Sequence, residues 1–258
     1  MAWRRACGMG MAAIALLAVS SMVAPARAAS SCAGPYLGLF AGYSWSDARA
    51  TSPFDAGTGF FYNWTGRSYG IEADGFFGGA TLGYNWQSDA LVAGLAGELG
   101  YLGLSGSAID PNFQPGTVPI SDTVTRLRAG FYGVVYGQLG IAHGDFLFFG
   151  KGGVAFLDAD ASTIDPCAGT PGCGTTTLSM TGSKTMVGWS AGAGVEWAFA
   201  PQLSAKAEYA SFDFGHIDIA GRSSVPGERY TQRNGVTAHS VKLGVNYRFA
   251  ASPLAVQY

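Results

Sequence analysis

Residues 240–249 read SVKLGVNYRF, and the character of the side chains alternates along the whole stretch. The odd-numbered positions are apolar: Val241, Leu243, Val245, Tyr247 and Phe249. The even-numbered positions are polar or tiny: Ser240, Lys242, Gly244, Asn246 and Arg248. Because successive side chains of a strand point to opposite faces, the pattern predicts a β-strand with one apolar face. In a soluble sandwich that face turns inward, whereas in a membrane barrel it meets lipid and the polar face lines the lumen.

The same alternation recurs upstream. It predicts strands over residues 36–45, 75–86, 91–101, 125–141, 146–157, 185–199 and 203–212. The connections 87–89, 142–145 and 200–202 are short, and the other four are long. Short periplasmic turns alternating with long external loops are typical of outer-membrane barrels. The sequence therefore predicts an all-β fold, an eight-stranded antiparallel up-and-down transmembrane β-barrel over residues 29–249. A hairpin hidden in a long loop would raise the number to ten strands.

The composition agrees with a barrel and excludes other classes. Charged residues make up 12% of the 258 residues, and 39 residues are glycine. This charged fraction is about half of the ~25% usual for soluble domains, and disordered chains are rich in charge and poor in aromatic residues. A net charge of -2 supplies no basic surface for phosphates, so we expect no nucleic-acid partner.

The first residues have the features of a signal peptide. Arg4 and Arg5 precede an apolar stretch over 11–19, and Ala26 and Ala28 place small residues where a signal peptidase cleaves. The alternative is an N-terminal membrane anchor, but the apolar stretch is short for a span of ~20 residues. We expect residues 1–28 to be removed on export.

Several of these stretches resemble the small outer-membrane β-barrel family of Gram-negative bacteria, the porin-family or outer-membrane immunogenic protein group, related to outer membrane protein A-like barrels. The matching stretches are YLGLFAGYSW at 36–45, LGYNWQ at 82–87, VGWSAGAGVEWAF at 187–199, KAEY at 206–209 with DFG at 213–215, and the C-terminal strand at 241–249. The resemblance implies a location in the cell outer membrane, with outer-membrane lipid and lipopolysaccharide as surroundings. It also implies that Val245, Tyr247 and Phe249 form the signal read by the outer-membrane assembly machinery.

The chain departs from that family in two places. Members commonly stop at the residue matching Phe249, whereas this chain continues over 250–258. We expect a short tail outside the strand; the alternative is that Tyr258 serves as the terminal aromatic residue. Tyr136 and Gln138 stand where the family often has arginines, which puts a carried-over pattern of interior charge in doubt there.

Charged side chains are predicted on the inner face of most strands. The set is Glu98, Arg126, Arg128, Lys151, Glu196, Lys206, Glu208, Lys242 and Arg248. An eight-stranded barrel is just wide enough for its side chains to fill, and charges within a nonpolar slab must be paired or hydrated. We expect a salt-bridge network that plugs the lumen; the alternative is a narrow ion path.

No catalytic or cofactor motif stands out. His143, His216 and His239 are the three histidines, and His239 and Ser240 are neighbours on a strand, so their side chains point to opposite faces and cannot pair. We expect no enzyme, metal or cofactor.

Three cysteines remain after export. Cys167 and Cys173 are close together in a long loop, and export favours a disulfide between them. Cys32 is left over, and Ala29-Ser30-Ser31 before it makes a poor lipidation signal.

The first long loop is unusually aromatic. It holds Phe54, Phe60, Phe61, Tyr62 and Trp64. These rings either pack at the barrel rim or form a contact surface for a ligand, which the sequence does not identify. The expected function is a structural barrel that displays external loops, supports the envelope and contacts a surface ligand or host; the alternative is a narrow channel for ions or small solutes.

Overall fold

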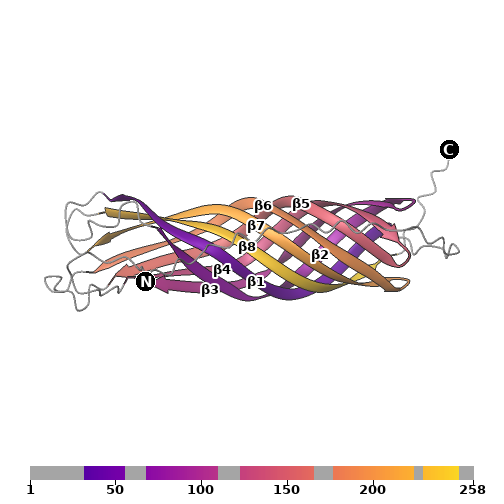
Figure 1. The fold of residues 1–258 in the computed structure, drawn as a ribbon, viewed down its shortest axis with the longest axis horizontal. Coiled ribbons are helices and arrows are strands. Elements are labelled where there is room, and N and C mark those ends of the chain that lie inside the picture. Colours follow the sequence, from indigo (N-terminus) through magenta and orange to yellow (C-terminus); the bar gives the residue numbers. More distant parts are fainter. Residues whose placement is uncertain (1–31, 56–67, 110–122, 166–176, 224–228, 250–258) are drawn as a thin grey trace, which may run out of the picture.

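The computed structural model describes residues 32–55, 68–109, 123–165, 177–223 and 229–249, which form one closed barrel (Figure 1). Its strands are β1 (Gly34–Asp55), β2 (Ser68–Ser88), β3 (Leu91–Ile109), β4 (Val124–His143), β5 (Phe146–Asp165), β6 (Leu178–Ala200), β7 (Leu203–Ser223) and β8 (Arg229–Arg248). Each strand pairs antiparallel with the next, and β1 pairs with β8 to close the barrel. The predicted eight-stranded up-and-down architecture is confirmed. Within the described residues, no helix is long and apolar enough to cross a membrane.

Tight turns join the strands at one end of the barrel (Figure 1). Asp89 and Gly144 have positive φ values of 51° and 61° in the turns after β2 and β4. Glycine adopts this left-handed conformation without a steric penalty, which explains its place in the second turn. The turn between β6 and β7 contains Pro201 and Gln202.

Most of the strands are much longer than the alternation predicted, and β4 is the exception because its predicted range 125–141 is nearly complete. They contain 19 to 23 residues each, whereas crossing a membrane takes about 9–11. Most of the additional residues lie toward the end opposite the tight turns, and at most two per strand lie at the turn end. The connections at that end therefore cover only 56–67, 110–123, 166–177 and 224–228, and the expectation of four very long loops is wrong.

The extensions were missed because their alternation has the opposite sign. In β1, Ala48 and Ala50 are buried inside the barrel, while Asp47 and Arg49 are exposed outside it. The sequence prediction depends on apolar side chains that face outward, whereas the apolar side chains of the extensions face inward.

An irregularity in β4 reverses which side chains face the lumen. The pairing of β4 with β5 shifts by one residue between Ala129 and Tyr132. Leu127 is 1% exposed, whereas Phe131 beyond the shift is 70% exposed. An extra residue moves every later side chain to the opposite face. A similar shift lies in β7, where Gly215 has a φ of 72° and is followed by the exposed His216.

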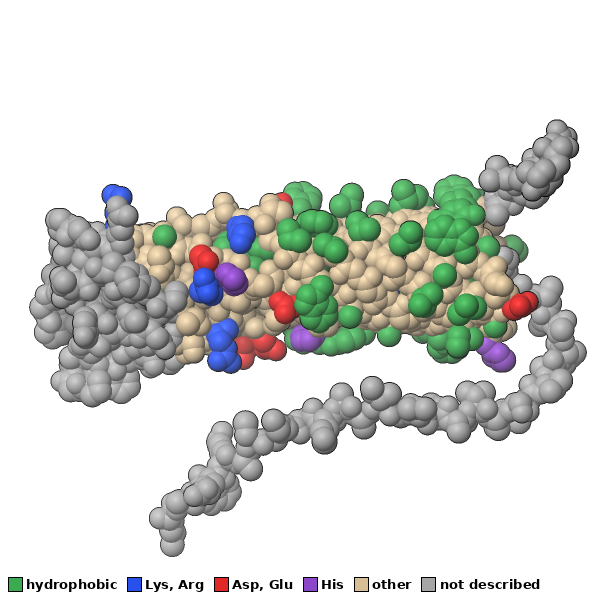
Figure 2. Space-filling view, turned by 90° about the horizontal axis from the view of Figure 1, so that it is seen from above, with side chains coloured by type: hydrophobic (Ala, Val, Ile, Leu, Met, Phe, Trp, Pro, Cys, Tyr) green, Lys and Arg blue, Asp and Glu red, His purple; other side chains and the backbone are tan. Residues whose placement is uncertain are grey.

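The half of the barrel next to the tight turns, which we call the turn half, has an apolar outer surface (Figure 2). Its exposed members include Leu39, Phe76, Leu82, Leu95, Leu99, Phe131, Val135, Leu139, Ile141, Val187, Leu243 and Val245. Exposed aromatic residues border this belt: Trp86, Trp197, Phe199, Tyr247 and Phe249 toward the turns, and Tyr43, Trp45, Tyr101 and Trp189 toward the other end. An apolar band between aromatic girdles is the lipid-facing surface of a membrane barrel.

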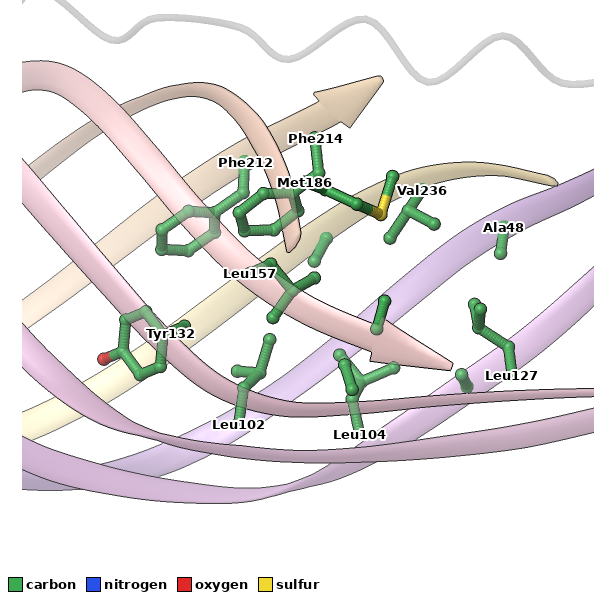
Figure 3. Close-up of a cluster of buried hydrophobic side chains, with 14 of the residues drawn as sticks. Ala48, Leu102, Leu104, Leu127, Tyr132, Leu157, Met186, Phe212, Phe214 and Val236 are labelled. Carbon is green, nitrogen blue, oxygen red and sulfur yellow. The ribbon is translucent and has the colours of Figure 1, made fainter. Parts of the chain in front are cut away.

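The half of the barrel opposite the tight turns, which we call the extended half, has an apolar interior instead (Figure 3). Its buried side chains include Leu102, Leu104, Leu127, Leu157, Met186, Phe212, Phe214, Ile217, Ile219 and Val236. Figure 2 shows charged side chains gathered on the outside of the same half, where few hydrophobic side chains are exposed. The barrel therefore reverses its polarity along its axis: the turn half is apolar outside, and the extended half is apolar inside.

Candidate functional site

Five charged side chains meet inside the turn half of the barrel. They are Glu98 from β3, Lys151 from β5, Lys206 and Glu208 from β7, and Lys242 from β8. Each occupies an inward position of its strand, and each side chain is at most 4% exposed. The sequence alternation placed all five on the inner face.

The two glutamates are bridged by two lysines. Lys242 Nζ lies 2.6 Å from both carboxylate oxygens of Glu98 and 3.0 Å from Glu208 Oε1. Lys151 Nζ lies 3.1 Å from Glu98 Oε1 and 2.5 Å from Glu208 Oε1. Lys206 makes one longer contact, 3.5 Å to Glu208 Oε2. The network therefore ties four strands together across the lumen.

Two aromatic rings lie next to the lysines of this cluster. Lys151 Nζ lies 4.0 Å from the centre of the Tyr136 ring, and Lys242 Nζ lies 4.6 Å from the centre of the Phe40 ring. A ring face attracts a cation, most strongly where water is excluded. The rings therefore fill lumen space and stabilise the ammonium groups together with the carboxylates.

A second polar layer lies nearer the tight turns. Gln138 Nε2 donates a hydrogen bond of 2.8 Å to Asn85 Oδ1, and Ser204 Oγ donates one to Glu196. Arg248 is buried at this end, where its guanidinium interacts with Cys32. Burial raises the pKa of the Cys32 thiol.

A third polar layer closes the apolar core near the opposite end, and the sequence analysis missed it. The Thr125 hydroxyl lies 2.6 Å from the Tyr69 hydroxyl and 2.7 Å from the Thr163 hydroxyl. Thr163 Oγ1 donates to Gln232 Oε1 at 2.5 Å, and Gln232 Nε2 donates to the Tyr69 hydroxyl at 3.1 Å. The four side chains form a closed ring. Tyr69, Thr163 and Gln232 lie in strand segments outside the predicted ranges. Thr125 lies within the predicted strand 125–141, but the predicted alternation placed it on the outer face.

Two of the predicted interior charges lie elsewhere. Arg126 and Arg128 are exposed on the outside of the barrel, so placing them in the lumen was wrong. The shift in β4 between Ala129 and Tyr132 is the cause, because the prediction carried one alternation through the whole strand.

The histidines show no catalytic arrangement. His239 Nδ1 lies 2.9 Å from the Tyr209 hydroxyl on the outside of the barrel, whereas Ser240 is buried inside it. His143 ends β4, and His216 lies on the outer surface. In the part of the chain that the structure describes, no three His, Cys, Asp or Glu side chains are grouped to hold a metal ion.

The remaining candidates lie at the ends of the barrel or beyond it. Val245, Tyr247 and Phe249 are exposed near the tight turns. The backbone of Phe54 is paired with Thr231 in β8. Outside the described residues lie Phe60, Phe61, Tyr62, Trp64, Cys167, Cys173, the expected signal peptide 1–28 and the tail 250–258.

Comparisons with known proteins agree on the architecture. The model of the outer membrane protein beta-barrel domain family matches residues 13–249. The 31 kDa outer-membrane immunogenic protein of Brucella melitensis is 28% identical, over 84% of this chain and 83% of its own. The 25 kDa outer-membrane immunogenic protein of Brucella abortus is 26% identical, over 85% and 80%.

A solved structure shows the same type of fold. The outer membrane protease OmpT from Escherichia coli aligns with a TM-score of 0.50 and 9% identity, over 84% of this chain and 97% of that one. At this identity, the likeness concerns the fold alone. The closed barrel, its apolar belt and the family match together establish that this chain belongs to the outer membrane protein beta-barrel domain family and resides in the cell outer membrane.

Proposed function

We propose that this protein is a structural, non-enzymatic barrel with a plugged lumen, whose extended half raises its connecting loops above the membrane surface. The observation that carries the proposal is the reversal of polarity along the axis. A half with a buried apolar core and a charged outer surface is built as a water-soluble barrel is built, so it stands in an aqueous environment.

The extension is tall enough to matter at the cell surface. It adds roughly 8–10 residues per strand at ~3.3 Å each, and a tilt of about 40° reduces this to a height of roughly 20–25 Å. Loops at such a height are presented beyond the lipid headgroups. That position suits contact with a surface ligand or a host, and it suits the immunogenic character for which the Brucella relatives are named.

The lumen supports a structural role more than transport. The cluster of five charged side chains around Glu98 fills the lumen of the turn half. Apolar side chains, together with the polar ring of Tyr69, Thr125, Thr163 and Gln232, fill the extended half. Such interlocked side chains also tie the strands to one another, which supports a contribution to envelope integrity.

Single-channel recording in planar bilayers tests the plug. We expect no stable openings from the refolded mature chain, with insertion verified by flotation with the lipid. Stable openings of porin size would contradict the proposal. The cluster contains three lysines and two glutamates, so brief anion-selective openings would favour the alternative of a narrow ion path instead.

Epitope insertion tests the display role. A tag placed within residues 110–122 should be labelled by antibody on intact cells, whereas the same tag in the turn at 143–145 should be labelled only after the outer membrane is opened. Equal labelling of the two positions on intact cells would refute the orientation on which display depends.

The contact role of the aromatic loop is tested separately. Replacing Phe60, Phe61, Tyr62 and Trp64 by serine should abolish binding to any host surface that the wild-type protein binds, while assembly continues. Unchanged binding would assign the contact to another loop.

A further inference from the structure

We propose that the outer face of β4, β5 and β6 binds lipopolysaccharide, with Arg126 and Arg128 holding a phosphate of its headgroup and an apolar groove beneath them holding an acyl chain. This site goes beyond the display role and does not depend on the state of the lumen.

A polar groove of about 480 Å³ lies at this place, just beyond the apolar belt. Its polar lining is Arg126, Arg128, Asp160, Ser162, Thr181 and Ser183. The strand register arranges these side chains in two rows. Arg126 lies beside Ser162, which lies beside Thr181; in the next row, Arg128 lies beside Asp160, which lies beside Ser183. The groove is therefore built by the register of three strands.

The two arginines have no acidic partner in the described part of the chain. Neither guanidinium lies within 4.0 Å of a described carboxylate, although Asp160 is the cross-strand neighbour of Arg128. By contrast, Arg233 elsewhere on the same surface pairs with Asp218 at 2.8 Å. Two guanidiniums that stand two residues apart on one face attract a shared anion, and their forked donors match the oxygens of a phosphate.

An apolar groove of about 630 Å³ adjoins the polar one on the side of the membrane. Tyr101, Phe131, Gly133 and Phe156 line it, and the Thr185 hydroxyl donates to Asp158 at its edge. Both grooves run along the same strands, with the apolar one lower and the basic one higher. This is the order in which a membrane lipid presents its acyl chain and its phosphate.

The other polar groups favour a glycolipid over a phospholipid. Asp160 accepts hydrogen bonds but repels phosphate, and the three hydroxyl side chains can both donate and accept. Sugar hydroxyl groups suit these partners. A headgroup that combines phosphates with a sugar satisfies the arginines and Asp160 together, whereas a simple phosphodiester satisfies only the arginines.

Native mass spectrometry of the refolded mature chain in dodecyl maltoside micelles tests the site, with diphosphoryl lipid A as the probe. Enzymatically dephosphorylated lipid A and phosphatidylglycerol are the comparison ligands. The test variant is R126Q/R128Q. The matched control is R49Q/R222Q, which removes the same charge from exposed positions on β1 and β7. The heat-dependent shift in gel mobility verifies that each variant is folded.

We expect wild type and control to bind diphosphoryl lipid A alike, and R126Q/R128Q to bind it at least about tenfold more weakly, since charge-assisted hydrogen bonds are lost. Dephosphorylated lipid A should bind equally weakly to all three proteins. Equal losses in both double variants would show diffuse attraction and overturn the site. Equal binding of phosphatidylglycerol would overturn the assignment to a glycolipid.

Discussion

Lys206 differs from the other two lysines of the interior cluster. It makes one contact of 3.5 Å, whereas Lys242 contacts both glutamates at 2.6 to 3.0 Å. Removing one partner of a buried ion pair costs about 3–5 kcal/mol because the other charge stays buried. We expect Lys242→Met to destabilise the barrel by about this amount. Lys206→Met should cost clearly less, because it removes the surplus positive charge.

Unfolding by urea in lipid vesicles measures the difference. Both variants replace lysine with an unbranched side chain, so each serves as the packing control for the other. Equal losses of stability would contradict the assignment of Lys242 as the principal bridge.

The pair of Asp218 and Arg233 on the extended half is sensitive to pH. The hydrogen bond from Arg233 holds the pKa of the Asp218 carboxyl below its ordinary value. The stability that the Asp218–Arg233 pair contributes is therefore fully present above a pH of about 3.9, which is the ordinary pKa of an aspartate. This stability is lost as the pH falls through the lowered pKa of Asp218 in the folded protein. Both side chains are about half exposed, so the contribution is small.

Titration by carbon NMR of the Asp218 carboxyl tests this pair. Arg233→Gln should raise the pKa of Asp218, whereas Arg222→Gln, on the same strand as Asp218, should leave it unchanged. A pKa that does not move in Arg233→Gln would show that the hydrogen bond does not form in solution.

At the scale of the element, β4 shows how one extra residue redirects a strand. Leu127 faces the core and Arg126 faces outward, although the alternation of the C-terminal part of β4 predicts the reverse. On intact cells, a membrane-impermeant maleimide should therefore label Arg126→Cys more than the wild-type chain, and Leu127→Cys no more than the wild-type chain. Each variant controls for the other, because both place the thiol at the same height. Increased labelling of Leu127→Cys alone would show that Leu127 faces outward and Arg126 faces the lumen, as the sequence predicted, and it would contradict the proposed lipid site.

The C-terminal strand carries a different prediction. Phe249 follows β8, its backbone N–H donates to the Pro35 carbonyl at 3.0 Å, and its ring contacts Tyr247. If Val245, Tyr247 and Phe249 are read by the assembly machinery, Phe249→Ala should lower the amount of folded barrel in the outer membrane severalfold. Deletion of residues 250–258 should leave that amount unchanged. The opposite result would identify Tyr258 as the terminal aromatic residue.

At the scale of the whole molecule, the sequence predicted the half of the barrel that lies in lipid. There, an apolar outer face alternates with an inner face that holds the charged residues along most of the strands, and the inward positions of Glu98, Lys151 and Lys242 follow directly. Strand β5 is the least regular, because Leu147 and Phe149 also face inward. In the extended half the polarity is reversed, so Asp47 and Arg49 look like loop residues. The register shift in β4 depends on pairing between strands, which no local pattern records. The polar ring around Thr125 also required the paired strands, because its members are far apart in the sequence.

The reversal of polarity makes a prediction about how stability is distributed along the axis. If the apolar core sustains the extended half, Leu157→Ala should cost about 2–5 kcal/mol through the cavity that it leaves. Its effect on amide hydrogen exchange should be concentrated in the extended half, including residues 217–221 and 230–236. Leu243→Ala, which removes an exposed side chain of the lipid-facing belt, is the matched control and should leave exchange in those segments unchanged. Both variants should be measured in the same micelles. If exchange accelerates evenly over the whole barrel in Leu157→Ala, the two halves unfold as one unit, and the extended half depends on the turn half for its stability.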